Sequence, residues 1–273
     1  MTDQQQRYDR VARGYARWWA PVLRPTAITI LDRIEPSVTA GGTDVLDVGT
    51  GTATLAIEAV RRWPRVRVVG IDASSGMANA ARAEADRLLS RTDRKRFRTQ
   101  VAFADELPFD DGSFDAAMSS FVLQLVPNRR AVLDEVHRVL RPGARFAHVT
   151  WRVGDRTFQP DVEYDAALED VGLDPEPPEV RGGDFASVEA AAAGLRRAGF
   201  RNVHAIGGEL THRFDRDGYV GFMEEFDQED FFSSLEPDLR ERLHRRFIER
   251  LDRLPSDAFV LRLPVVAAEG IRR

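Results

Sequence analysis

The stretch VLDVGTGTA, residues 45–53, decides the fold of this chain. Residues 45–48 form a mostly apolar run that is typical of a buried strand, and the two glycines after it predict a tight turn into a helix. Glycine lets the backbone approach a ligand closely and adopt conformations that a side chain forbids. A strand, a glycine-rich turn and a helix in this order predict a ligand cradle at the carboxyl edge of a parallel sheet.

Two positions beside the turn narrow the class of ligand. A dinucleotide-binding fingerprint has glycine or alanine three residues after the second glycine, where this chain has Thr54. Asp47 stands two residues before Gly49. A carboxylate there is unfavourable beside a pyrophosphate but is compatible with a cationic or hydroxyl-bearing ligand. Both positions count against a nicotinamide-dependent oxidoreductase, which stays the alternative enzyme.

Asp72 is predicted to end the second strand, 21 residues after Gly51. A carboxylate at this place can accept hydrogen bonds from both hydroxyls of a ribose. The alternative is a structural role, because an acid at the start of a helix interacts favourably with the helix dipole. The glycine-rich turn upstream favours ribose binding.

Asp105 is predicted to end the third strand. Its carboxylate could accept a hydrogen bond from an adenine amino group, while Leu107 and Ala73 cover the faces of the ring. Since neighbouring parallel strands end at the same edge of a sheet, Asp47, Asp72 and Asp105 are expected to lie along one edge and to form one site.

The other segments alternate between strand-like runs and helical periodicity, which predicts a parallel sheet with crossover helices. Ser74 and Asn128 are the predicted N-caps of two helices, and residues 141–143 are the predicted exit turn of the second. Seven strands are expected, over 45–48, 66–71, 98–104, 114–120, 145–151, 203–214 and 258–267. Helices are expected over 4–20, 24–39, 53–62, 74–90, 128–140, 185–198 and within 216–254, and a looser insertion over 155–183.

Composition limits the class of protein. The chain has 273 residues, of which 43% are hydrophobic and 30% charged, which suits one large α/β domain with a modest cap. No run of about 20 apolar residues is present, so no membrane-spanning helix is expected. The absence of cysteine excludes disulfides and cysteine-ligated zinc, and no metal site is visible. A net charge of −5 disfavours nucleic-acid binding, and the polar N-terminus predicts a cytoplasmic protein.

Four motifs together carry a family resemblance. They are VLDVGTGTA, VVGIDAS (68–74), ADELPFDDGSFDAAMSS (104–120) and LRPGARFAHVTW (140–151). In this order and spacing they resemble the class I S-adenosylmethionine-dependent methyltransferases, and most of all the small-molecule group that includes the ubiquinone/menaquinone methyltransferases. The resemblance covers about Tyr8 to Trp151, with a weaker echo at 195–200. It implies an α/β, Rossmann-like three-layer sandwich whose seven-stranded, mostly parallel sheet has an antiparallel last strand, with a helical cap insert.

The resemblance also implies a cofactor, S-adenosylmethionine, with S-adenosylhomocysteine as product. By carry-over, the glycine-rich turn holds its methionine part, Asp72 the ribose, and Asp105 with Glu106 the adenine end. Tyr8 and Tyr15 lie on the leading helix that covers the cofactor in this family, where they could reach its carboxylate or instead pack with Trp18 and Trp19. The full set expected to bind the cofactor is Tyr8, Tyr15, Asp47, Gly49, Thr50, Gly51, Asp72, Ala73, Met77, Asp105, Glu106, Leu107 and Ser120.

The chain is expected to be a single methyltransferase domain. Residues 1–40 are predicted to close over the cofactor, 41–152 to form the cofactor-binding core, and 153–273 to carry a helical substrate cap at about 216–254. Because a sulfonium methyl group is already activated, the reaction needs alignment more than acid–base catalysis. No catalytic residue is therefore named, and His148, inside the fifth strand, is expected to be a core residue.

The acceptor is expected to be a small, largely apolar molecule that is methylated on carbon or oxygen. The exit of the fourth strand lacks the Asn/Asp-Pro-Pro-Tyr/Phe motif of methyltransferases that act on nucleic-acid bases, and Gln124 stands where relatives often have histidine. Phenylalanines and acids in the cap predict an apolar lid with an acidic rim, or simple packing of the cap. Acceptor contacts are expected from Gln124, Trp151, Phe222 and Phe226. A cofactor-binding protein without turnover is the alternative outside enzymes.

Overall fold

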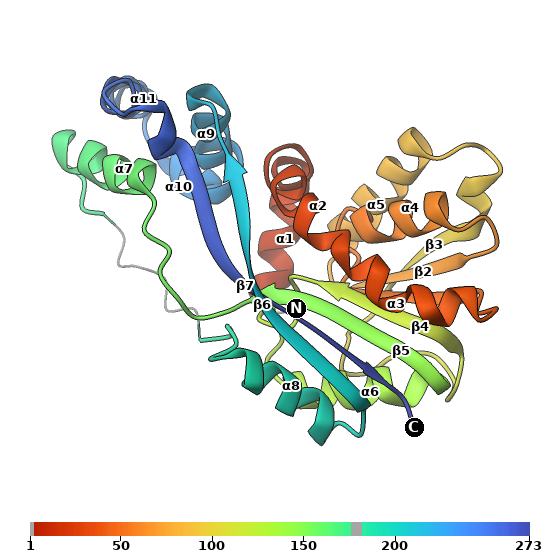
Figure 1. Cartoon of the computed structure of the whole chain (residues 1–273). Coiled ribbons are helices and arrows are strands. Elements are labelled where there is room, and N and C mark those ends of the chain that lie inside the picture. Colours follow the sequence, from red (N-terminus) through yellow and green to blue (C-terminus); the bar gives the residue numbers. More distant parts are fainter. Residues whose placement is uncertain (1–2, 176–181) are drawn as a thin grey trace.

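A seven-stranded sheet in the order β3-β2-β1-β4-β5-β7-β6 forms the centre of the protein (Figure 1). The computed structural model describes residues 3–175 and 182–273. The first five strands are parallel, and β7 runs antiparallel to both of its neighbours, which confirms the predicted fold class. The strands are β1 (Asp44–Val48), β2 (Arg67–Asp72), β3 (Phe97–Val101), β4 (Phe114–Ser120), β5 (Leu140–Trp151), β6 (Arg201–Arg213) and β7 (Val260–Ile271).

Helices cover both faces of this sheet, because its strands are apolar on both sides. On β1, Val45 packs into one hydrophobic cluster, while Leu46 and Val48 pack into the other. One face carries α3 (Thr29–Thr39), α4 (Thr54–Arg62) and α5 (Ser75–Leu88), and the other carries α6 (Arg129–Val139) and α8 (Val188–Arg197). Ser74 and Asn128 cap α5 and α6 as predicted, through hydrogen bonds from the N–H groups of Met77 and Ala131.

The N-terminal segment differs from the two predicted helices. It runs through α1 (Asp3–Gly14), a π-helical turn η1 (Tyr15–Trp19) and α2 (Ala20–Ala27) without a gap before α3 begins. In η1 the N–H of Ala20 donates to the carbonyl of Tyr15, five residues back. Pro21 has no N–H to donate into the preceding turn, which suits a widened turn at this point. The actual break lies at Ile28, not near residue 22.

The segment after β5 contains a helix, α7 (Gln159–Asp170), where the sequence predicted a looser insertion. Between β6 and β7 lie α9 (Arg216–Phe222), a second π-helical turn η3 (Met223–Asp227), α10 (Glu229–Ser234) and α11 (Pro237–Leu251). The outer ends of β6 and β7 extend beyond the sheet and carry these helices beside α7 (Figure 1). Short 3-10 turns, η2 (Asp93–Arg96) and η4 (Ser256–Phe259), precede β3 and β7, and the predicted exit turn 141–143 lies inside β5.

Candidate functional site

The glycine-rich turn after β1 has the backbone that its sequence predicts. Gly49, Gly51 and Ala53 have φ values of +69°, +53° and +64°, in the left-handed region that residues with side chains rarely adopt. A Cβ atom on Gly49 would lie 2.3 Å from Cγ2 of Val122 and 3.1 Å from its Cβ. Rotation of Val122 therefore cannot make room, and only glycine fits at position 49.

Asp47 lies beneath this turn and is almost completely buried. Its Oδ2 atom accepts a hydrogen bond of 2.8 Å from the hydroxyl of Thr50. Burial raises the pKa of Asp47 to about 7; this hydrogen bond opposes the rise and the negative charge of Asp72 adds to it. A buried carboxylate of this kind favours a cationic or hydrogen-bond-donating partner.

Asp72 joins the turn to the start of α5. Its Oδ2 accepts from the N–H of Gly51 at 2.9 Å, and its Oδ1 accepts from the N–H of Ser74 at 2.9 Å. Burial raises its pKa. Each oxygen keeps a second lone pair, so the carboxylate can still accept two hydroxyl hydrogen bonds. The geometry fits the expected ribose contact.

The residues expected at the adenine end of the cofactor lie beyond the end of β3. β3 ends at Val101, so Asp105 does not end that strand, as the sequence predicted, but lies in the exposed loop after it with Glu106. Because β3 ends before Asp105, the residues that follow the strand need not continue along the edge of the sheet. Leu107 is buried among the side chains under the opposite helix layer, and its N–H donates to Oε2 of Glu135 at 2.8 Å.

The N-terminal helices cover the glycine-rich turn. Oδ1 of Asp9 accepts hydrogen bonds from the Ser74 hydroxyl at 2.6 Å and from the N–H of Gly76 at 2.7 Å, which attaches α1 to the start of α5. Tyr15 packs edge-on against Tyr8, and burial raises the pKa of its hydroxyl. Tyr15 lies beside the glycine-rich turn, while Trp18 and Trp19 face the C-terminal helices.

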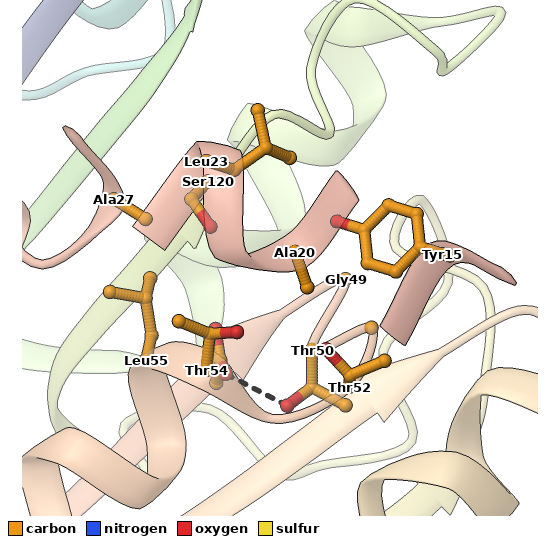
Figure 2. Close-up of a pocket in the computed structure, with 12 residues that line it drawn as sticks. Tyr15, Ala20, Leu23, Ala27, Gly49, Thr50, Thr52, Thr54, Leu55 and Ser120 are labelled. Carbon is orange, nitrogen blue, oxygen red and sulfur yellow. Dashed lines mark hydrogen bonds between the residues drawn. The ribbon is translucent and has the colours of Figure 1, made fainter. Parts of the chain in front are cut away.

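A small pocket lies between this cover and the turn. Figure 2 shows Tyr15 and Ala20 on one side, with Thr50 and Thr52 on the other. Of the other residues expected to bind the cofactor, Asp47, Gly49, Gly51 and Ser120 also line this pocket, and Met77 is buried in the first turn of α5. The pocket encloses about 20 Å³, room for about one water molecule. The pocket is therefore far too small to enclose the expected cofactor while the N-terminal segment has this position.

A much larger cavity, of about 740 Å³, lies between the N-terminal segment, α7 and η3. Phe226 lines it and packs against Tyr15 with ring centroids 5.7 Å apart, so one aromatic layer separates the cavity from the small pocket. The expected acceptor residue Phe222 also lines it. Trp151 is buried behind Trp19 and Phe121, with ring centroids 6.3 and 4.3 Å away.

Gln124 is held by its own neighbours: it donates to the carbonyl of Phe121 at 2.7 Å and accepts from the hydroxyl of Thr150.

The acidic rim of the cap, expected from Glu224, Glu225, Asp227, Glu229 and Asp230, is present in part. Glu224 pairs with His244 at 2.6 Å, and Glu225 accepts from Arg17 and from the indole of Trp18. Of the predicted cap acids, Asp227 and Asp230 line the cavity, and Phe232 is buried in the core. Sequence reasoning missed Asp161 and Asp165 of α7, whose four-residue spacing places them on one face of a helix. That spacing becomes a signal only once the segment is identified as helical.

Neither a metal site nor a membrane-spanning helix is found in the described ranges 3–175 and 182–273. No group of three or more histidine or acidic side chains there could hold a metal ion. No helix in the same ranges is both long and apolar enough to cross a bilayer. His148 lies fully buried in β5, between Phe146 and Phe185, and burial lowers its pKa to about 3.

Comparison with known proteins agrees with this geometry. Residues 45–143 match a family model described as a methyltransferase domain. A malonyl-[acyl-carrier protein] O-methyltransferase of Geobacter sulfurreducens is 33% identical over 65% of this chain and 64% of its own length. The ubiquinone/menaquinone C-methyltransferase UbiE of Geobacter sp. is 41% identical over 38% of this chain and 44% of its own. The chain thus spans less than two thirds of either relative.

Two further similarities extend over more of the chain. A nocamycin O-methyltransferase of Saccharothrix syringae is 29% identical over 85% of both proteins. The crystal structure of the [4+2]-cyclase SpnF covers 98% of this chain and 95% of its own, with a TM-score of 0.59 and 18% identity, and so shares the fold. With the strand order, the glycine-rich turn and Asp72, these matches place the chain in a family. It belongs to the class I S-adenosylmethionine-dependent methyltransferases and is homologous to UbiE and to small-molecule methyltransferases.

Proposed function

We propose that this protein transfers a methyl group from S-adenosylmethionine to a small, largely apolar acceptor, on carbon or oxygen. The observation that carries the proposal is the pair of adjoining pockets: a polar one at Asp47 and Thr50, and an aromatic cavity of about 740 Å³ beyond Phe226. A cavity of this volume is in the range that holds drug-sized ligands. Relatives named as O- and C-methyltransferases support the same class of reaction.

The chain's own residues bind and align the two reactants. Asp72 accepts hydrogen bonds from the ribose hydroxyls. The backbone at Gly49 and Gly51 allows close approach of the methionine part of the cofactor. The carboxylate of Asp47, which lies beneath the turn, attracts the ammonium group of that methionine part. When bound, the cofactor supplies an activated sulfonium methyl group. Tyr15 and Phe226 lie between the two pockets, so their rings must move aside for the acceptor atom to reach the methyl carbon directly. Beside the reacting atoms, the same rings would exclude water.

Positioning supplies the catalysis in this proposal. The described residues that line the large cavity include no histidine, and Gln124 is engaged with Phe121 and Thr150. Alignment of reacting groups alone can lower a barrier by about 7–11 kcal/mol. We propose a division of labour in which residues 1–40 cover the cofactor, 41–152 bind it, and 153–273 select the acceptor.

Calorimetric titration with S-adenosylmethionine, S-adenosylhomocysteine and NAD tests the proposal. We expect binding of the first two and not of NAD. Asp72→Ala removes two charge-assisted hydrogen bonds to hydroxyls, so we expect its affinity for S-adenosylhomocysteine to fall by about ten- to a hundredfold or more. Asp134→Ala, which removes an exposed carboxylate from α6, is the matched control.

Binding of NAD alone would make the oxidoreductase the better hypothesis. Unchanged affinity of Asp72→Ala would refute the ribose contact. Tight cofactor binding without methyl transfer to any of a panel of phenolic, quinone and isoprenoid acceptors would support the alternative hypothesis, that the protein binds the cofactor and catalyses no reaction.

A further inference from the structure

Among the described residues, 3–175 and 182–273, the lining of the large cavity holds more acidic than basic side chains. The arginine in this lining is Arg156, which forms an ion pair with Asp184, a residue that does not itself line the cavity. Asp230, at the rim, pairs with Arg10 at 2.7 Å, and both side chains are more than half exposed. The carboxylates that line the cavity are Asp161, Asp165, Asp174, Asp227 and Asp230.

Two of these carboxylates, the exposed Asp165 and the half-buried Asp227, line the cavity from two different elements. Asp165 belongs to the face of α7 that also presents Tyr164 and Leu168 to the cavity, and Asp227 comes from η3. Within ranges 3–175 and 182–273, neither forms an ion pair with an arginine, and Asp227 only accepts a hydrogen bond from the neighbouring Gln228 amide at 3.1 Å. Burial and the nearby Glu169 raise the pKa of Asp165.

The rest of the wall is mostly apolar and in large part aromatic. Trp19, Phe222 and Phe226 pack together with ring centroids 5.2 to 6.4 Å apart, and all three line the cavity. Aromatic faces attract organic cations as well as apolar rings, so this wall suits both parts of an amphipathic ligand. The described carboxylates do not converge into a cluster that could hold a metal ion.

The carboxylates and the aromatic side chains of the cavity favour a cationic acceptor over a neutral one. A neutral apolar molecule that fills the cavity strips water from Asp165 and Asp227 and offers no replacement, which is unfavourable for binding. A protonated amine on the same molecule replaces that water with an ion pair.

We propose that the acceptor is an amphipathic molecule with an aromatic or polycyclic body and a protonated amine that lies against Asp165 and Asp227. This inference rests on the proposed function, since it assumes that the cavity receives the acceptor. The protonated amine has no lone pair with which to attack a methyl group. It serves recognition. The methyl group is transferred to a carbon or oxygen elsewhere on the molecule: the new bond to the methyl carbon forms as its bond to sulfur breaks, S-adenosylhomocysteine leaves, and the proton of the attacked hydroxyl or carbon passes to water.

Three matched probes test the inference on the full chain. They are 9-(aminomethyl)anthracene, 9-(hydroxymethyl)anthracene and 9-anthracenecarboxylate, which share one ring system and are cationic, neutral and anionic at neutral pH. Each is titrated by calorimetry with and without saturating S-adenosylhomocysteine. We expect the amine to bind at least tenfold more tightly than the alcohol, and the carboxylate to bind most weakly.

Variants assign the preference to the two carboxylates. Asp165→Asn and Asp227→Asn keep the side-chain shape, and we expect each to lower the affinity for the amine several-fold while leaving the affinity for the alcohol unchanged. Asp257→Asn, an exposed residue far along the chain, is the charge-matched control and should change neither affinity. Circular dichroism verifies that all variants are folded.

Equal affinity for amine and alcohol, failure of both to bind, or an unchanged preference in both cavity variants would overturn the inference. The proposed function fails separately: if S-adenosylhomocysteine does not bind but the amine preference persists, the cavity selects cations without being an acceptor site. If S-adenosylhomocysteine binds and the preference is absent, the methyltransferase proposal stands and the acceptor is neutral.

Discussion

At the scale of single residues, the glycine-rich turn depends on the absence of one side chain. We expect Gly49→Ala to lower the free energy of unfolding by about 2–4 kcal/mol, because left-handed backbone strain adds to a forced contact with Val122. It should also lower the affinity for S-adenosylhomocysteine at least tenfold. Gly143 also has positive φ but open space around it, so Gly143→Ala should cost only the strain, about 1–2 kcal/mol. Urea unfolding of both variants checks this, and equal losses would contradict it.

A second residue, Asp47, makes stability depend on pH. Its pKa is about 7 in the folded protein, above its ordinary value near 3.8, so between these values the folded state binds more protons than the unfolded one. The free energy of unfolding must then decrease as pH rises from about 4 to about 7, by up to about 4 kcal/mol. Asp47→Asn should make the free energy of unfolding less dependent on pH. Compared with the parent protein, the variant should therefore be relatively more stable at pH 8 than at pH 4.5. Urea unfolding at pH 4.5 and pH 8 measures it, and parallel pH profiles of variant and parent would contradict it.

At the scale of elements, α1 is held to α5 mainly by Asp9. The Ser74 hydroxyl and the Gly76 N–H lower the pKa of Asp9, so this attachment is complete above its unfolded pKa and is lost as pH falls through the lowered one. Asp9→Ala should release α1, speed proteolysis near the N-terminus and weaken cofactor binding several-fold. Arg13→Ala, on the exposed side of α1, is the control. Identical digestion rates for the two variants would show that Asp9 does not hold the helix.

At the scale of the whole molecule, two π-helical turns join the cofactor-binding part to the C-terminal helices. A Cβ on Gly14 would lie 2.0 Å from the carbonyl oxygen of Glu225. Gly14→Ala should push η1 away from η3, lower the free energy of unfolding by about 1–3 kcal/mol, and weaken both cofactor and acceptor-probe binding. Gly208→Ala, where a Cβ makes an ordinary 3.5 Å contact with Val265, should do neither. If Gly14→Ala weakens binding at one pocket alone, the two pockets are not coupled through this contact.

The sequence by itself determined the strands of the sheet, the glycine-rich turn and the positions of Asp47 and Asp72. Each of these depends on a local pattern: an apolar run, glycines in a tight turn, or a carboxylate at a strand end. The antiparallel direction of the last strand was implied by the family resemblance and not by a local pattern. The sequence also predicted that α5 and α6 begin after Ser74 and Asn128, since a cap is a contact within one turn of helix.

Only the tertiary structure decided which carboxylates line the large cavity and which side chain forms a hydrogen bond with Gln124. Asp165 and Asp227 are 62 residues apart in the chain and line one cavity because α7 packs against α11, which like η3 lies between β6 and β7. α7 itself escaped prediction because its apolar side chains are few and become a buried face only against α11. Gln124 was expected to face the acceptor, but a partner 26 residues away, Thr150, engages its side chain. Contacts between distant segments leave no periodic trace in the sequence, and so they became visible only in the folded chain.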